Sequence, residues 1–342
     1  MIALQTTMNA LEPTGDAGRE YHAPVLPQEV LQAFAPVAGK CIVDCTLGGG
    51  GHTELLLGAG ARVIGIDQDP EAIAHASARL AQRVASGGKF EAIHSSFGDV
   101  PEVLARMGLV GVDGFLLDLG VSSHQLDTPE RGFSFQKQGP LDMRMNPGAL
   151  VTAADLVNTA SAEQLERMFR EYGEEPQARR IAQKLVKERL VRPFKRTLEL
   201  ADAVEAVSPR RGHTHPATRV FQALRIAVNR ELDVLEQTLE SLGHLLLAGG
   251  RLAVITFHSL EDRIVKQSFQ RRATPTLDRP EWPAPRANPE CIFRKVTSKP
   301  LIATEVEQRA NARSRSAKLR VVERLPGGPH ALGAARHAST AR

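Results

Sequence analysis

The sequence predicts an α/β protein in which a parallel sheet is interrupted by an inserted all-helical domain. From Cys41 to Gly120, short β-branched runs alternate with longer amphipathic stretches, which is the rhythm of parallel strand–helix–strand units. After Gly120 the chain becomes turn-rich, and residues 152–207 have the pattern of several helices with no convincing strand between them. The strand–helix rhythm resumes at residue 218, so we expect one domain to be split by another.

The first half of the predicted sheet contains four strands. Asp69 precedes Pro70 and is expected to cap a helix that begins there, and Pro101 lies in the first turn of the next helix. The fourth strand has too few polar residues to be half-exposed, so helices are expected on both faces of the sheet. The predicted strands are residues 41–46, 62–67, 90–96 and 114–120, and the predicted helices are residues 53–60, 70–84 and 99–108.

The second half of the chain adds a long predicted helix over residues 218–247, a buried strand over 251–257 and a helix after His258. Residues 273–289 are rich in proline and are expected to form a loop, while alternation over residues 316–325 predicts a final strand. The expected organisation is a disordered tail (1–20), a first sheet segment (21–139), an inserted helical substrate-recognition domain (140–216), a second sheet segment (217–325) and a disordered tail (326–342).

The composition is that of an ordinary soluble globular protein, with 42% hydrophobic and 24% charged residues among 342. The N-terminal residues carry Glu12 and Asp16 without a basic segment, so we expect neither a signal peptide nor a membrane span, and a cytoplasmic location follows. Cys41, Cys45 and Cys291 are too few for a disulfide framework or a four-ligand zinc site, and no metal site is predicted.

The net charge of +4 is concentrated near the C-terminal end. Residues 301–342 hold eight Lys and Arg against three Glu, a net +5, which leaves −1 for the first 300 residues. A basic segment such as RANARSRSAKLR suits phosphate-rich partners, but it is as typical of a solvated charged face. Composition alone leaves both interpretations open.

The stretch VDCTLGGGGHT (residues 43–53) places four glycines between a predicted strand and a predicted helix. This arrangement holds nucleotide-like ligands through backbone amides. A dinucleotide-binding G-x-G-x-x-G pattern would require glycine where Thr53 or Glu54 stands, so an NAD-dependent oxidoreductase is disfavoured. The spacing from Asp44 to Gly50, an acidic residue followed after three residues by G-x-G, resembles the first motif of S-adenosylmethionine-dependent methyltransferases.

The predicted second strand ends in a carboxylate suited to a ribose. Asp67 lies nineteen residues after Gly48, where an acidic side chain can accept hydrogen bonds from both ribose hydroxyls. Asp69 directly precedes Pro70 and is assigned to helix capping instead. Phe97, just past the third strand, is placed to lie near an adenine ring, although a phenylalanine at a strand end is as often part of the core.

The predicted fourth strand leads into LLDLGVSSHQLD, which should face the methyl donor because ligands bind at the carboxyl ends of parallel strands. Asp118 stands at this edge and can accept from an exocyclic base amine, and Ser122 and Ser123 are expected to orient the base. Methylation of a pyrimidine at C5 would require a thiolate, and residues 110–140 contain no cysteine. Direct methyl transfer to nitrogen is therefore favoured.

Several longer strings resemble those of one family. The chain is similar to the bacterial 16S rRNA N4-cytosine methyltransferases (RsmH, also MraW) over about residues 22–324, in HAPVL, DCTLGGGGHT, GIDQDPEAI, DGFLLDLGVSSHQLDTPERGFSFQKQGPLDMRMNP, HPATRVFQALRIAVNRELDVLE, LLAGGRLAVITFHSLEDRIVK and NARSRSAKLRVVER. The resemblance implies a Rossmann-like class I methyltransferase sheet interrupted by a helical domain. It also implies N4-methylation of a cytidine in the decoding region (P site) of 16S rRNA. Gly49 and His124 depart from the family pattern.

The resemblance further implies the cofactor, its contacts and the partners of the chain. The implied cofactor is S-adenosylmethionine, and His52 and Gln125 are assigned to it only on this ground. The implied partner is 16S rRNA or the small ribosomal subunit, and the oligomeric state is left open, with a homodimer among the options. The implied cofactor contacts are Gly50, Gly51, His52, Asp67, Phe97, Asp118 and Gln125.

RNA binding has several candidate segments. RGFSF (residues 131–135) could stack on an unstacked base or act as a hydrophobic staple for the insertion, and HSLEDRIVK (residues 258–266) could offer polar groups to the substrate or simply begin a helix. A non-catalytic RNA-binding protein on a methyltransferase scaffold is the other alternative. Besides the basic C-terminal tail, the candidate phosphate surface consists of Lys184, Lys187, Arg189, Arg192, Lys195 and Arg196.

Overall fold

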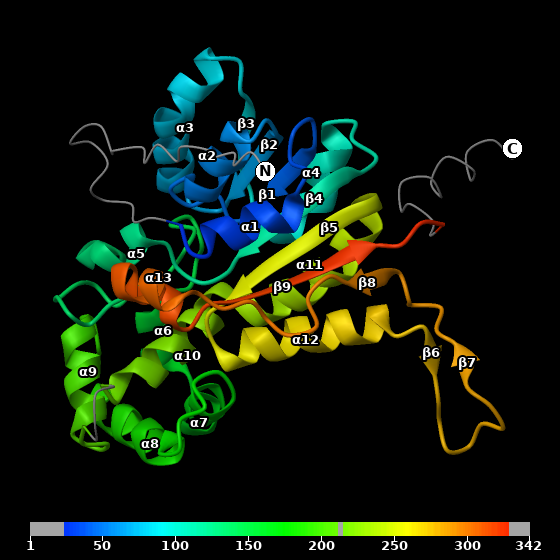
Figure 1. Cartoon of the computed structure of the whole chain (residues 1–342). Coiled ribbons are helices and arrows are strands. Elements are labelled where there is room, and N and C mark those ends of the chain that lie inside the picture. Colours follow the sequence, from blue (N-terminus) through cyan, green and yellow to red (C-terminus); the bar gives the residue numbers. More distant parts are fainter. Residues whose placement is uncertain (1–23, 211–214, 328–342) are drawn as a thin grey trace, which may run out of the picture.

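The computed structural model describes residues 24–210 and 215–327. The predicted tail over residues 1–20 lies outside the described residues, as does the predicted C-terminal tail from residue 328 onward. Figure 1 shows a sheet with helices on both sides, a separate group of helices next to it and a hairpin that extends away from it. This is the predicted α/β architecture with a helical insertion.

Within the described residues the main sheet has seven strands in the order β3-β2-β1-β4-β5-β9-β8. The strands from β1 to β5 are parallel, whereas β9 pairs antiparallel with β5 and with β8. The strand order reverses between β1 and β4, and ligands bind at such a switch point. The strands are β1 (Cys41–Asp44), β2 (Arg62–Asp67), β3 (Lys89–His94), β4 (Val112–Asp118), β5 (Leu246–Thr256), β8 (Phe293–Lys295) and β9 (Lys318–Arg324).

Helices cover both faces of this sheet, which confirms the prediction from the apolar strands. Successive residues of β1 face opposite sides, because side chains alternate along a strand. Ile42 packs with residues of α1, α2 and α3, and Val43 packs with residues of α4, α11 and α12. The covering helices are α1 (Pro27–Phe34), α2 (Gly51–Gly58), α3 (Pro70–Ala85), α4 (Val100–Arg106), α11 (Glu231–Leu245) and α12 (Ser259–Ala273).

A second group of helices has its own apolar core, which extends from Phe133 to Leu224 and includes fully buried Leu165. Helix α10 contributes to this core and then leads back to the sheet, so it joins the two parts of the chain (Figure 1). The predicted domain boundaries at residues 140 and 216 stay predictions. The helices of the group are α6 (Ala153–Thr159), α7 (Ala162–Glu171), α8 (Ala178–Arg189), α9 (Thr197–Glu205) and α10 (Ala217–Asn229).

The prediction of one continuous helix over residues 218–247 is wrong, because the chain forms α10 and α11 with a break between them. Arg230 at the break has a left-handed φ of 51°. Neither glycine nor proline stands at this position, so the periodic pattern of hydrophobic residues continues across it and predicts a single helix. Arg225 and Glu231 form an ion pair across the break, with 2.9 Å between Nε and Oε1.

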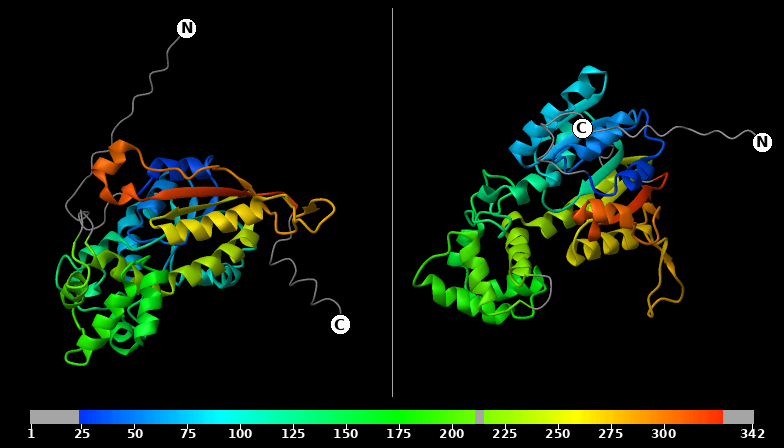
Figure 2. Two further views of the ribbon diagram at one scale, coloured as in Figure 1. Left: turned by 90° about the horizontal axis from the view of Figure 1, so that it is seen from below. Right: turned by 60° about the vertical axis from the view of Figure 1, so that its left-hand side comes forward.

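The other predicted elements shift mainly at their ends. β5 begins at Leu246, before the predicted start at residue 251, and the predicted final strand is β9. The predicted loop over residues 273–289 contains a short antiparallel hairpin of β6 (Thr276–Leu277) and β7 (Arg286–Ala287). Figure 2 shows this hairpin extending beyond the rest of the described chain.

Candidate active site

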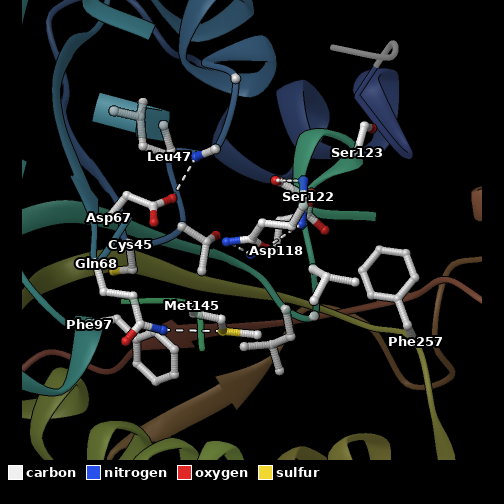
Figure 3. Close-up of a pocket in the computed structure, with 18 of the residues that line it drawn as sticks. Cys45, Leu47, Asp67, Gln68, Phe97, Asp118, Ser122, Ser123, Met145 and Phe257 are labelled. Atoms are coloured by element: carbon white, nitrogen blue, oxygen red, sulfur yellow. Dashed lines mark hydrogen bonds between the residues drawn. The ribbon is translucent and has the colours of Figure 1, made fainter. Parts of the chain in front are cut away.

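A cavity of about 340 Å³ lies at the carboxyl ends of β1, β2 and β4, where the strand order reverses. We call one side the near wall: it consists of residues 45–49, residues 51–52, Asp67 and Phe97. The opposite side is the far wall, formed by residues 119–123, residues 125–126, the α10–α11 break and Arg313. Asp67, Phe97 and Asp118 extend toward this space from three different strand ends (Figure 3).

The glycine loop of the near wall is held by two carboxylates, the buried Asp44 and the partly buried Asp67. Asp44 accepts a hydrogen bond from Thr53 Oγ1 at 2.7 Å, and Gly48 N donates to Asp67 Oδ2 at 2.8 Å. Asp67 also accepts from the amide of Asp69 at 2.9 Å, which ties the loop to the end of β2. The loop is therefore shaped by residues close to it in the sequence.

The glycines of the loop have different roles. Gly50 is not among the residues that line the cavity: its amide donates to Leu47 O, and a Cβ at this position would lie 3.2 Å from Ala76 Cβ of α3. Its assignment as a cofactor contact stays a prediction. Its left-handed φ of 77° turns the chain into α2. Gly51 and His52 begin that helix and line the cavity, and amides of a first helical turn have no acceptor within the helix. The backbone amides of Gly51 and His52 can therefore bind an anionic group.

Asp67 is a carboxylate of the near wall with a strongly shifted pKa. Burial raises its pKa to about 6, although the hydrogen bonds from the amides of Asp69 and Gly48 oppose this rise. Asp69 itself caps α3 by accepting from Glu71 N at 3.0 Å, which confirms its predicted role. Asp67 is thus the carboxylate that faces the cavity, and Asp69 serves the helix.

A buried network connects Asp69 to the far wall. Its Oδ2 accepts from Gln125 Nε2 at 2.9 Å and from Arg131 Nη1 at 2.6 Å. Arg131 also donates to the carbonyl groups of Arg144 and Met145, at 3.1 and 2.9 Å. Gln125 lines the cavity, as predicted, but its side chain is already bound within the protein.

The segment RGFSF acts as the hydrophobic staple and not as a stacking platform. Phe133 is buried in the core of the helical group. Phe135 packs edge-on against Phe221, with 4.8 Å between ring centroids, and lies beside His215. Neither phenylalanine lines the cavity, so the alternative in which they stack on the target base is not supported.

At the centre of the cavity, the carboxylate of Asp118 lies near the imidazole of His52. His52 Nε2 is 3.6 Å from Asp118 Oδ2, and the histidine is only 6% exposed. Burial lowers the pKa of His52, but the negative charges of Asp118 and of the more distant Asp44 and Glu307 raise it more, so its pKa is raised overall. The amide of Asp118 donates to Thr46 Oγ1 at 2.6 Å, which fixes the end of β4.

Ser122 and Ser123 line the cavity at the start of α5 (Ser123–Asp127), and both already have partners. Ser122 caps α5 by accepting from Gln125 N at 3.2 Å. Ser123 Oγ accepts a short hydrogen bond from the guanidinium of Arg313. The two hydroxyls are therefore held in place before any substrate binds.

The prediction from the residues missed the part of the far wall at the α10–α11 break. Arg225, Asn229 and Glu231 line the cavity at the α10–α11 break. Asn229 Oδ1 accepts from Met145 N at 2.8 Å, so the break also positions the segment after the fourth strand. Because these residues occur inside one of the family strings, the resemblance was the only signal that could have found them.

The segment HSLEDRIVK begins α12, as the second of its two interpretations proposed. Glu261 Oε2 accepts from Phe257 N at 2.8 Å, and Oε1 lies 3.1 Å from His258 Nε2. Glu261 nevertheless lines the cavity, where its buried carboxylate adds negative charge.

The predicted basic surface is only partly available to a phosphate. In the insertion, Arg189 donates to the carbonyl groups of residues 157 and 160, each at 2.7 Å. Arg320 of the C-terminal segment is bound to Asp262 at 2.7 Å, and Arg324 is buried. The exposed members of the predicted set are Lys187, Arg192, Lys195 and Arg196 in the insertion, and Arg309 and Arg315 in the described part of the C-terminal segment.

The sheet, the glycine loop and the carboxylates at the ends of β2 and β4 define the class of the protein as a Rossmann-like methyltransferase. The chain belongs to the MraW methylase family, whose model matches residues 19–325. This confirms the family resemblance of the sequence motifs.

Relatives support the same family. The ribosomal RNA small subunit methyltransferase H of Geobacter sp. (strain M21) is 51% identical over 317 residues, covering 89% of this chain and 99% of that protein. The protein of the same name from Geobacter sulfurreducens is 50% identical over 316 residues, again covering 89% of this chain and 99% of its own length. A solved rRNA methylase from Streptococcus thermophilus aligns over 87% of this chain and 95% of that one, at 12% identity and a TM-score of 0.40, which adds nothing to the assignment.

The described residues contain no helix that is both long and apolar enough to span a membrane. Over the same ranges, no group of three or more His, Cys, Asp or Glu side chains could hold a metal ion. Cys41, Cys45 and Cys291 are free thiols, and Cys45 is buried in the core.

Proposed function

We propose that this chain transfers a methyl group from S-adenosylmethionine directly to the exocyclic N4 amine of a cytidine in the decoding region (P site) of 16S rRNA. The observation that carries the proposal is one cavity bounded by a glycine loop, a ribose-type carboxylate and an acidic strand end. Membership of the MraW methylase family and two relatives named as ribosomal RNA small subunit methyltransferase H support it.

The residues of the near wall fit S-adenosylmethionine. Asp67 is a partly buried carboxylate that can accept from a ribose diol, and Phe97 offers an aromatic face for adenine. The first amides of α2, at Gly51 and His52, suit the carboxylate of the methionine portion. Gln125 completes the proposed contacts through its place in the wall. When bound, this cofactor supplies an electrophilic methyl group.

The proposed residues for the chemistry lie next to this site. Asp118 accepts from the N–H bonds of the target amine and holds the nitrogen in line with the methyl group. Ser122 and Ser123, which are fixed by α5 and Arg313, orient the base. Because the cavity also has to hold the cofactor, the cytidine enters alone, unstacked from its neighbours.

The proposed partner is the small ribosomal subunit or its RNA. The proposed location of the protein is therefore the cytoplasm. The exposed basic side chains Lys187, Arg192, Lys195 and Arg196 of the helical domain (residues 140–216) are proposed to contact phosphates. A homodimer is a further proposal, which sedimentation at several concentrations can test.

The decisive experiment is mass spectrometry of nucleosides from small-subunit rRNA incubated with the protein and labelled S-adenosylmethionine. We expect labelled N4-methylcytidine at one position. The Asp118→Asn variant should bind the cofactor with little change in calorimetry but transfer the methyl group much more slowly. Binding of NAD instead of S-adenosylmethionine, or binding without transfer to any RNA, would contradict the proposal and favour the oxidoreductase or the non-catalytic alternative.

A further inference from the structure

One buried histidine of the cavity has no hydrogen-bond partner. Neither ring nitrogen of His52 is hydrogen-bonded, although the residue is 6% exposed and lines the cavity. Its nearest charged atom is Asp118 Oδ2, at 3.6 Å from Nε2, and Asp118 Oδ1 is also buried without a partner. In catalytic pairs such a distance is often long before the substrate binds.

The charged groups around His52 are mostly negative. Asp118 faces it from the end of β4, Asp44 from the end of β1 and Glu307 from α13 (Glu305–Ala310). Asp44 is engaged by Thr53 Oγ1, and Glu307 accepts from the amide of Leu26. Asp118 is therefore the carboxylate that is both close to the imidazole and open to the cavity.

The other carboxylates of the cavity have less freedom to take up a proton. Asp67 accepts from two backbone amides, and Glu261 accepts from the amide of Phe257 while pairing with His258. Glu231 is paired with Arg225. His52 and Asp118 differ from them because both keep an unbound buried polar atom next to the proposed reaction centre.

We propose that His52 holds the proton that methyl transfer releases, and that it receives this proton through Asp118. The inference rests on the proposed function. As the new N–C bond forms, the methyl C–S bond of S-adenosylmethionine breaks, its electron pair stays on sulfur, and S-adenosylhomocysteine is the leaving group. One N–H bond of the amine also breaks, its electron pair stays on nitrogen, and the proton passes to Asp118 Oδ2 and then to His52 Nε2. The resulting imidazolium lies among carboxylates and loses its proton to solvent when the product leaves.

The raised pKa of His52 fits this role. Burial alone lowers the pKa of an imidazole, but here the surrounding carboxylates, Asp118 first, raise it overall, so the protonated form is stabilised. The imidazole has to be neutral before each turnover. Activity should therefore rise as the pH increases through the pKa of His52 and fall when the pH drops below it.

The first measurement needs no cofactor or RNA. The ring nitrogens of ¹⁵N-histidine-labelled protein are titrated by NMR, and the His52 signal is assigned as the one missing in His52→Gln. We expect a midpoint above the ordinary value of about 6.5 in the wild type and a lower midpoint in Asp118→Asn. An Asp118→Asn midpoint equal to that of the wild type would overturn the proposed pair.

The second measurement is the pH profile of methyl transfer to small-subunit RNA. We expect the acid limb of wild-type kcat to coincide with the NMR midpoint. His52→Gln should lower kcat on the order of 100-fold, lose that limb and keep the KM for S-adenosylmethionine. The matched control is His124→Gln, because His124 pairs with Glu71 at 3.1 Å on the nearby α5 and should leave the profile unchanged.

Each result bears on one proposal. A His52→Gln enzyme with the wild-type acid limb would overturn the proton route while leaving the proposed function intact. If His52→Gln does not fold, the wild type decides, because an acid limb that differs from the NMR midpoint has the same consequence. Failure of the wild type to methylate any RNA would overturn the proposed function, and this inference with it, whatever the NMR midpoint.

Discussion

The two walls of the cavity are stabilised by different kinds of contact. In the near wall, Asp67 is held by the backbone amides of Gly48 and Asp69, which are close to it in the sequence. In the far wall, Asn229 binds the amide of Met145, and the two residues are 84 positions apart. The hydrogen bonds of Asp67 in the near wall thus span at most 19 positions, whereas the far wall at the α10–α11 break depends on segments far apart in the sequence.

This difference also affects electrostatics. In the near wall, burial raises the pKa of Asp67 to about 6. This carboxylate can therefore change its protonation state or exchange its hydrogen-bond partners. In the far wall, Arg225 is paired with Glu231, and the network next to this wall pairs Arg131 with Asp69. A carboxylate such as Asp67 suits ligand binding, whereas the ion pairs hold the helical group against the sheet.

The strongest test of this comparison removes the bond between the walls. Arg131→Met should reduce the free energy of unfolding by about 3 kcal/mol, because the buried Asp69 carboxylate loses its cation. Denaturation in urea measures this change. The matched control, Arg170→Met on the surface of α7, removes an arginine that is 66% exposed and should cost less than about 1 kcal/mol. An equal loss in the free energy of unfolding for Arg131→Met and Arg170→Met would show that the buried ion pair does not join the walls.

A smaller effect is expected when the near wall alone is altered. Asp67→Asn should weaken S-adenosylmethionine binding roughly 30-fold at pH 7.5, about 2 kcal/mol, because an amide accepts less strongly than a carboxylate. Since Asp67 has a pKa of about 6, wild-type affinity should fall below this pH as the carboxylate gains a proton, approaching about tenfold per pH unit. Calorimetry at roughly six pH values between 5 and 7.5 measures the loss of affinity in Asp67→Asn and the pH dependence of the wild-type affinity.

Asp67→Asn should bind with little pH dependence, which makes it the control for the wild-type profile. Asp99→Asn, which changes an exposed carboxylate just after Phe97, should leave both the affinity and its pH dependence unchanged. If Asp67→Asn retained the wild-type pH profile, another group of the cavity would be responsible.

The smallest effect is expected at the α10–α11 break. Arg230→Gly should stabilise the protein by about 1 kcal/mol, because glycine adopts the left-handed φ of 51° without steric cost. Thermal unfolding measures the shift. Glu236→Gly, at an exposed position inside α11, should have the opposite sign and a similar size. Loss of stability in Arg230→Gly would mean that the arginine side chain, and not the backbone, maintains the break.

Most near-wall features were predictable because their signals are local. Asp67, Asp69 and Asp118 could each be assigned from their distance to a glycine loop, a proline or the end of an apolar strand. Which glycines of the loop line the cavity depends on tertiary packing, because a Cβ at Gly50 would meet Ala76 of α3.

The far wall was less predictable for a physical reason. No glycine or proline marks Arg230, so the helix break is decided by tertiary contacts around it. Likewise, RGFSF allowed two roles, and only the packing of Phe135 against Phe221 distinguished them.

By itself, the sequence determined the order of strands and helices, the split of the sheet and the acidic residues at the strand ends, because side-chain periodicity and turn residues act over a few positions. Only the tertiary structure decided that His52 meets Asp118, that Arg131 joins Asp69 to the far wall and that α10 and α11 separate at the cavity. Those contacts depend on distances between residues far apart in the chain, which no local pattern records.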